Sequence, residues 1–124
     1  MTKIICGVDV SSQTLDACIG REGPSQSFDR TPEGIQALAI FCQSHDVEFV
    51  AMEATGGFEK LPFSLLWLAG MPCAIVNPRN VRRFAESMGV FEKADHIDPG
   101  VIAHFAEVKK TVPQTAILKV GRSL

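Results

Sequence analysis

Two aspartates three residues apart, Asp95 and Asp98, stand directly before an apolar helical pattern in the stretch KADHIDPGVIAHFA. Pro99 follows Asp98 at once, and an aspartate followed by proline is a favoured beginning of a helix. A role as helix cap would account for Asp98 but not for Asp95. The other interpretation is that the two carboxylates form half of a metal site.

Two further acids interrupt apolar segments of the chain. Asp9 lies within KIICGVDV, and Glu53 ends FVAME. A carboxylate among apolar residues is costly to desolvate unless a partner compensates its charge. If the two segments are neighbouring strands, the pair would favour a shared cation. The alternative for each acid is a position at a strand end from which it reaches solvent.

Helical spacing indicates how the four acids could converge. Asp98 precedes the apolar positions 101, 102 and 105 at helical spacing, which would turn it toward the sheet, and Asp95 would lie about one turn earlier on the same side. Four converging carboxylates repel one another unless divalent cations neutralise them, and such oxygen ligands suit Mg²⁺ or Mn²⁺. Two such ions roughly 4 Å apart can activate the attacking oxygen and stabilise the leaving oxygen of a phosphodiester. The pattern therefore favours phosphoryl transfer on nucleic acid.

Alternating strand and helix patterns would position these acids. Apolar runs bounded by turn-forming residues predict strands, and helical spacing after Thr31-Pro32 and Asn77-Pro78 predicts capped helices. The predicted strands cover residues 3–10, 15–20, 25–30, 47–54 and 71–76, and the predicted helices cover residues 31–45, 58–70, 77–89 and 98–110. This order predicts an α/β fold in which a mixed sheet is flanked by helices on both faces.

Length and composition limit the architecture and the partners. A chain of 124 residues, 46% of them hydrophobic, can bury one ordinary core, and we expect one domain over residues 1–110, with residues 111–124 as a linker or a truncated edge. The formal net charge of −2 argues against a protein that holds nucleic acid mainly through a strongly basic surface. A phosphate partner would therefore need a local basic patch or a bound cation.

The cysteines and the hydropathy pattern indicate the compartment. The four cysteines are far apart, lack C-x-x-C spacing and have apolar neighbours, which predicts buried thiols in a reducing cytosol rather than disulfides or a zinc site. No segment has the pattern of a signal peptide or the length of a membrane span. We expect a soluble, cytoplasmic chain without a membrane partner.

Three segments of the chain together resemble a known family. They are GVDVSSQTLDACI, MEATGGFE and NPRNVRRFAESMGVFEKADHIDPGVIAHFA. In this order they resemble the amino-terminal DEDD domain of insertion-sequence transposases related to the Piv pilin-gene invertase, over about residues 3 to 108. The resemblance implies a RuvC-like domain with a ribonuclease H-like fold.

Carried over residue by residue, the resemblance implies a catalytic, metal-binding acidic tetrad and the cofactor Mg²⁺ or Mn²⁺. The tetrad comprises Asp9, Glu53, Asp95 and Asp98. The family usually has alanine after the second aspartate, whereas Pro99 stands here and restricts the backbone of Asp98. This departure bears on the orientation of the Asp98 side chain.

The resemblance also implies nucleic-acid contacts. Thr55, Gly56 and Gly57 match the motif that follows the glutamate, where small residues allow a backbone or a phosphate to approach closely. Lys93 matches the lysine before the aspartate pair, and we expect it to contact a phosphate.

Three arginines form a candidate basic patch on the helix predicted at residues 77–89. Arg79, Arg82 and Arg83 lie opposite or beside its apolar stripe, so a merely solvated face is one interpretation. Their position shortly before the acid pair favours a phosphate contact instead. The aromatic residues Phe58, Trp67, Phe84 and Phe105 fall at helical core positions and are interpreted as packing.

The function implied by the resemblance is that of the catalytic domain of a DNA transposase or recombinase, which cleaves and joins strands during insertion-sequence transposition. Its partner would be DNA, and some members of the family are directed by a structured RNA of their own element. Because paired ends recombine, the intact protein is expected to be a homo-oligomer. The family also carries a carboxy-terminal domain with a serine proposed for strand exchange, and no such motif surrounds Ser123. We therefore expect a fragment, or the product of a truncated element.

Two other functions remain open from the sequence. The segment GVDVSSQTLD also resembles the phosphate loop of actin-like sugar kinases and ATPases, but the further phosphate and adenosine motifs of such proteins are not visible. The other alternative is a truncated module that binds DNA or dimerises without catalysis. The complete set of acids argues against this second alternative.

Overall fold

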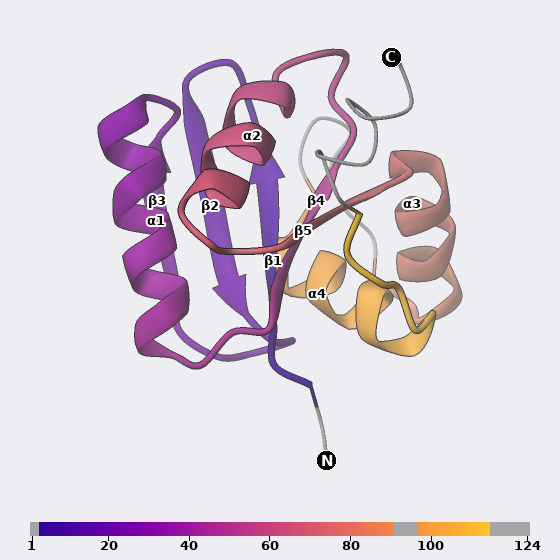
Figure 1. Cartoon of the computed structure of the whole chain (residues 1–124). Coiled ribbons are helices and arrows are strands. Elements are labelled where there is room, and N and C mark those ends of the chain that lie inside the picture. The colour runs from indigo at the N-terminus through magenta and orange to yellow at the C-terminus, as the bar shows by residue number, and fades with distance from the viewer. Residues whose placement is uncertain (1–2, 91–96, 115–124) are drawn as a thin grey trace, which may run out of the picture.

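The computed structural model describes residues 3–90 and 97–114. It alternates strands and helices in the predicted order (Figure 1). The elements are β1 (Ile5–Val10), β2 (Thr14–Ile19), β3 (Ser25–Asp29), α1 (Pro32–Ser44), β4 (Phe49–Glu53), α2 (Lys60–Leu68), β5 (Cys73–Val76), α3 (Pro78–Ser87) and α4 (Pro99–Val108). The α/β fold class with a mixed sheet is thereby confirmed.

The five strands form one sheet in the order β3-β2-β1-β4-β5. Strands β1, β2 and β3 form an antiparallel meander, whereas β4 and β5 run parallel to β1. Neighbouring parallel strands need a crossover connection, which α1 and α2 supply. As a result, the carboxyl ends of β1, β4 and β5 lie at the same edge of the sheet.

Helices cover both faces of the sheet. Helices α1 and α2 contribute to one hydrophobic cluster with Cys6 and Val8 of β1, and α3 and α4 contribute to a second cluster with Ile5 (Figure 1). Successive side chains of a strand point to opposite faces. The odd-numbered positions of β1, including Asp9, therefore face the layer of α3 and α4.

Helix α4 lies unusually close to the main chain of the sheet. A Cβ atom at Gly7 of β1 would collide with the carbonyl oxygen of Pro99 and would lie 2.6 Å from the backbone nitrogen of Ala103. A Cβ atom at Gly100 would collide with the carbonyl oxygen of Arg21, which follows β2. These two glycines thus let the first turn of α4 lie directly against the backbone of β1 and of the segment after β2. Gly7 is two residues before Asp9 in β1.

The predicted helix caps are confirmed. The Thr31 hydroxyl accepts a hydrogen bond from the Gly34 amide at 3.0 Å, and the Asn77 side chain accepts one from the Arg79 amide at 2.8 Å. Each of these caps is followed by a proline at the first helical position, where its missing N–H costs nothing. The four cysteines are buried and free, as predicted, and they are Cys6, Cys18, Cys42 and Cys73.

The helix predicted at 58–70 begins later than expected. It starts at Lys60, because Gly56 and Gly57 adopt φ angles of 73° and 123°, which no helix admits. Phe58 consequently lies in the preceding loop and is 44% exposed, so its predicted place in a helical core was wrong.

The last described residues run beside the sheet. Gln114 forms an isolated antiparallel bridge with Cys73, and its side-chain oxygen accepts a hydrogen bond from the Ile75 amide at 2.7 Å. The domain boundary at residue 110 stays a prediction. Among the described residues, no helix has the length and apolar character needed to cross a membrane.

Candidate functional site

Two buried carboxyl groups lie side by side at the carboxyl edge of the sheet. The parallel register pairs Val8 with Met52, so the next residues, Asp9 and Glu53, are neighbours at the ends of β1 and β4. Both are on the face covered by α3 and α4, and each is 6% exposed. The structure thus brings together two of the four acids singled out in the sequence.

The electrostatics of this pair depend on its burial. Burial, a hydrogen bond with Asp9 and the negative charge of Asp9 raise the pKa of Glu53 to about 7, and the nearby charge of Arg82 opposes that rise. The second carboxyl oxygen of Glu53, Oε2, is buried and has no hydrogen-bond partner among the described residues. A buried oxygen without a donor is costly and marks a position where a cation or a proton would be favourable.

Asp98 is the N-cap of α4. Its Oδ1 accepts a hydrogen bond from the Gly100 amide at 2.8 Å, its Oδ2 lies 3.9 Å from Nη1 of Arg21, and its side chain is 49% exposed. The backbone of Asp98 is not helical, with φ −57° and ψ 123°, so the helical spacing that would turn its side chain toward the sheet does not apply. The cap interpretation is confirmed, and a metal-binding role of Asp98 stays a prediction.

Two residues of the predicted site, Asp95 and Lys93, lie outside the described residues. Within residues 3–90 and 97–114, no group of three Asp, Glu, His or Cys side chains is close enough to hold a metal ion. Among the described residues, Asp9 and Glu53 are therefore a pair of buried carboxyl groups without a third such side chain beside them.

The loop that follows Glu53 is held by a residue that the sequence analysis did not single out. Oε1 of Glu59 accepts hydrogen bonds from the Thr55 amide at 2.9 Å, the Thr55 hydroxyl at 3.0 Å and the Gly57 amide at 3.0 Å. Desolvation raises the pKa of Glu59, but these bonds outweigh it and the pKa is lowered. In the sequence, the only sign of this role was that Glu59 stands two residues after a Gly-Gly pair, where a carboxylate can accept hydrogen bonds from the amides of a turn.

A second overlooked acid faces Asp9 across the antiparallel ladder. Asp16 of β2 pairs with Asp9, and its Oδ1 accepts a hydrogen bond from Oγ of Ser27 at 2.6 Å. Asp16, Asp9 and Glu53 therefore stand on three adjacent strands, which are spaced about 4.8 Å apart. From the sequence, only the length of the turn between β1 and β2 could have indicated that Asp16 pairs with Asp9.

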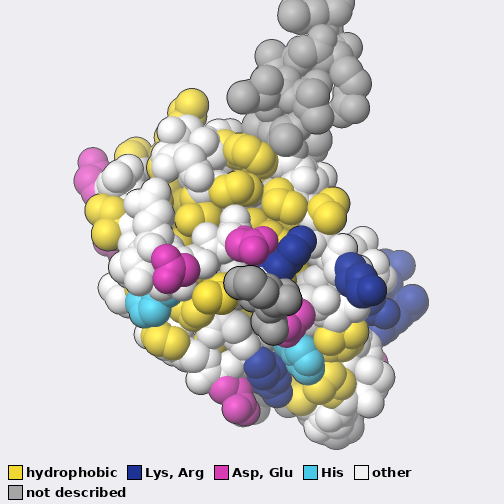
Figure 2. All heavy atoms as spheres, turned by 60° about the horizontal axis from the view of Figure 1, so that its bottom comes forward, with side chains coloured by type: hydrophobic (Ala, Val, Ile, Leu, Met, Phe, Trp, Pro, Cys, Tyr) yellow, Lys and Arg dark blue, Asp and Glu magenta, His cyan; other side chains and the backbone are white. Residues whose placement is uncertain are grey.

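The basic residues of α3 point to different sides of the helix. Arg79, Arg82 and Arg83 are all exposed. The charge of Arg82 acts on Glu53, which places this side chain near the acidic pair. Arg83 instead lines a groove between α3 and α4 together with Lys109. Figure 2 shows Lys and Arg side chains gathered at the side of the molecule where Figure 1 places α3.

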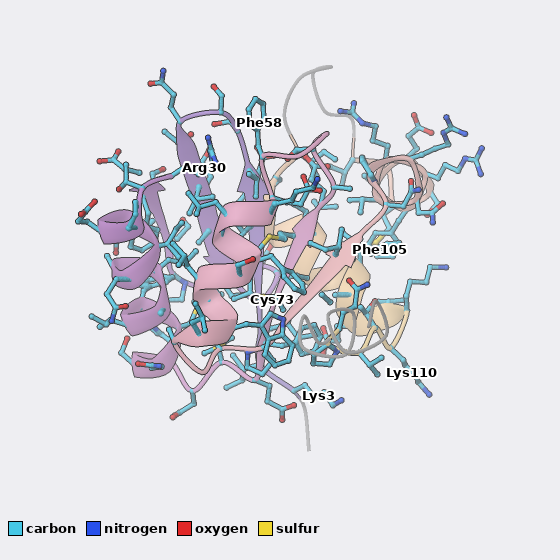
Figure 3. The ribbon with its side chains drawn as sticks, turned by 45° about the horizontal axis from the view of Figure 1, so that its top comes forward. Lys3, Arg30, Phe58, Cys73, Phe105 and Lys110 are labelled. Atoms are coloured by element: carbon cyan, nitrogen blue, oxygen red, sulfur yellow. The ribbon has the colours of Figure 1, made fainter. Side chains whose placement is uncertain are left out.

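Arg30 joins three loops at the edge that carries the acids, through a cation–π contact and a hydrogen bond. The guanidinium of Arg30 lies 5.2 Å from the centre of the Phe58 ring, and its Nε donates a hydrogen bond to the Ser12 carbonyl at 2.8 Å (Figure 3). Ser12 belongs to the turn between β1 and β2, and Phe58 to the loop after β4. This contact limits the freedom of the loops beside Asp9 and Glu53.

The sequence is similar to known proteins over most of its length. A family model described as a transposase, that of the DEDD transposases of IS110, matches residues 6–118. The pilin gene-inverting proteins of Moraxella bovis and Moraxella lacunata are each 29% identical over 114 residues, which cover 85% of this chain and 34% of the relative. The chain thus spans about a third of the length of these curated relatives.

Solved structures share the fold. RuvC of T. thermophilus in complex with a Holliday junction substrate has a TM-score of 0.59 at 15% identity and covers 90% of this chain and 98% of its own. The Thermus thermophilus RuvC structure has a TM-score of 0.58 at 15% identity, with 89% and 98% covered. At this identity the likeness shows the fold, and it confirms the predicted ribonuclease H-like, RuvC-like class.

Proposed function

This chain belongs to the DEDD transposase family of IS110, and on that premise we propose that it is the catalytic domain of a DNA recombinase that cleaves and joins strands with the help of divalent metal ions. The observation that carries the proposal is the buried pair of Asp9 and Glu53. Two carboxyl groups with little access to solvent repel each other once both are charged, and their oxygens suit a hard cation.

The residues present fit half of a magnesium or manganese site. Asp9 and Glu53 would supply oxygen ligands, among them the Glu53 Oε2 that no described donor contacts. We propose that Asp95 and Asp98 complete the set. When bound, Mg²⁺ or Mn²⁺ would activate the attacking oxygen and stabilise the leaving oxygen of the phosphodiester.

The other residues of the site would hold and orient the substrate. Arg82 provides a positive charge beside the acidic pair and would contact the phosphate that is cleaved. Glu59 fixes the loop of Thr55, Gly56 and Gly57, so that the backbone can approach the nucleic acid in one conformation. Lys93 is proposed as a further phosphate contact.

The partner that we propose is DNA. The relatives are pilin gene-inverting proteins, and a protein of the same fold was solved in complex with a Holliday junction substrate, which supports a role in recombination. An RNA of the element, a homo-oligomer of the intact protein and a cytoplasmic location are proposals that follow from the family. The family match favours this function over an actin-like nucleotide-binding domain.

The second candidate is a module that binds DNA or dimerises without catalysis. The observation in its favour is that the described residues hold only a two-carboxylate half site. A metal titration separates the two functions, because the second candidate has no need of a cation at Asp9.

Calorimetric titration of Mn²⁺ into the purified chain tests the proposal. We expect binding that is lost in Asp9→Asn. Asp46→Asn is the matched control, because Asp46 is exposed and has a φ angle of 56°, which asparagine tolerates. Cleavage of branched DNA should follow the same pattern. Equal binding by Asp9→Asn and the parent chain would refute the site.

A further inference from the structure

A groove between helices α3 and α4 lies apart from the acidic pair. It has a volume of about 570 Å³ and is lined by Asn80, Arg83, Phe84, Ser87, Phe105 and Lys109. The α3 positions 80, 83, 84 and 87 form one helical stripe. Arg82 and Glu86 line a separate, smaller cavity with Val90. The two neighbouring arginines of α3 therefore serve different surfaces.

The floor of the groove is formed by packed aromatic rings. The rings of Phe84 and Phe105 pack edge to face with their centres 5.6 Å apart, and Phe84 also packs against His104 at 5.3 Å. Phe105 is 7% exposed and belongs to the core cluster of this layer (Figure 3). The floor thus fixes the spacing of the two helices that carry the polar rim.

The rim of the groove is positively charged. Arg83 and Lys109 are exposed, and Asn80 and Ser87 add neutral polar groups. None of the described lining residues is an acid, and neither cation forms an ion pair with another described residue. In a chain whose formal net charge is −2, two cations over one groove, with no described acid paired to either, are complementary to a polyanion.

We propose that the backbone of a DNA strand, outside the stretch that is cleaved, lies over this groove with its phosphates at Arg83 and Lys109. This inference rests on the proposed function, since it takes DNA as the partner. Phosphate contacts position a nucleic acid without reading its sequence. Arg82 at the acidic pair and Arg83 at the groove would then hold the DNA on both sides of α3 and fix its register relative to Asp9.

The salt dependence of DNA binding tests the inference. Each phosphate contact contributes about 0.9 to the slope of log K against log salt. In fluorescence anisotropy with a four-way junction of labelled DNA, Arg83→Gln with Lys109→Gln should therefore make the slope shallower by about 1.8. Lys3→Gln with Lys60→Gln removes the same charge elsewhere and should leave the slope unchanged. Equal slopes for the two double variants, or no DNA binding by the parent chain, would overturn the proposal.

A crosslinking experiment tests the position. Because the native thiols are buried, a maleimide photocrosslinker would attach selectively at Ser87→Cys in the groove, or at the control Ser64→Cys, an exposed position of α2. We expect crosslinks to DNA from position 87 and not from position 64. The reverse pattern, or crosslinks from position 87 to an RNA strand of equal length but not to DNA, would refute the assignment.

Failure of this inference and failure of the proposed function give different results. Loss of the charges at positions 83 and 109 should leave Mn²⁺ binding at Asp9 and Glu53 intact. If Mn²⁺ binding and cleavage persist while the slope does not change, the groove inference alone is wrong. If the slope changes but Asp9→Asn alters neither Mn²⁺ binding nor cleavage, the metal mechanism alone is wrong.

Discussion

Replacement of Glu53 by glutamine tests the electrostatics of the acidic pair directly. Burial, the hydrogen bond with Asp9 and the charge of Asp9 raise the pKa of Glu53 from 4.5 to about 7, against the opposing charge of Arg82. Between these values the folded state holds a proton that the unfolded state has lost. The free energy of unfolding in the absence of metal should therefore fall as the pH rises from about 4.5 through 7.

The size of the effect follows from the same two values. The difference between 4.5 and about 7, at 1.36 kcal/mol per pH unit, corresponds to about 3 kcal/mol of unfolding free energy lost by pH 8. Glu53→Gln keeps the shape of the side chain and removes the ionisation. The variant should therefore be less sensitive to pH by about this amount, and more stable than the parent chain at pH 8.

Urea unfolding at pH 5 and pH 8, with a chelator present, measures this difference. Glu48→Gln, which removes an exposed acid just before the same strand, should follow the parent chain. Addition of Mn²⁺ at pH 8 should stabilise the parent chain and the Glu48 variant but not Glu53→Gln. A parent chain and a Glu53→Gln variant with parallel pH dependence would refute the reasoning.

Three further changes give distinct outcomes. Gly7→Ala should lower the unfolding free energy by about 1–3 kcal/mol because its methyl group would collide with the Pro99 carbonyl, and unchanged urea stability would contradict that close approach. Asp98→Ala should lower the unfolding free energy by about 1 kcal/mol because the helix cap is lost, whereas Asp98→Asn should keep most of that stability. Loss of Mn²⁺ binding in Asp98→Asn would then identify Asp98 as a metal ligand, and retained binding would leave it as a cap alone. Glu59→Ala should cost about 1–3 kcal/mol, because three hydrogen bonds in the loop after β4 lose their acceptor, and unchanged thermal unfolding would show that the loop does not depend on them.

Local patterns in the sequence were sufficient for most of the fold. The Thr31-Pro32 and Asn77-Pro78 pairs begin helices because the cap and the proline act within one turn of the chain. Apolar runs with β-branched residues identified the strands, because strand formation also depends on residues that are adjacent in the chain. The proximity of Asp9 and Glu53 could be predicted because both acids lie at or near the carboxyl ends of apolar strands whose order was recognisable.

The features that were missed depend on geometry beyond the local pattern. The direction of Asp98 could not be obtained from helical spacing, since its own backbone is not helical. Phe58 was assigned to a helical core from its place in the apolar pattern. The positive φ angles of two glycines delay the start of α2, so Phe58 lies in a loop instead. Asp16 comes to face Asp9 only through the register of an antiparallel pair, which the turn between the strands decides.

The contacts at Gly7 and Gly100 anchor the beginning of α4 on the main chain of the sheet and of the segment after β2. A side chain can change its rotamer to make room, whereas these backbone atoms cannot, so this end of α4 has little room to shift against the sheet. Asp98 caps its start and Lys109 follows its end, about 15 Å away for ten residues. A displacement of α4 as one body would therefore move the Asp98 cap and Lys109 of the α3–α4 groove together.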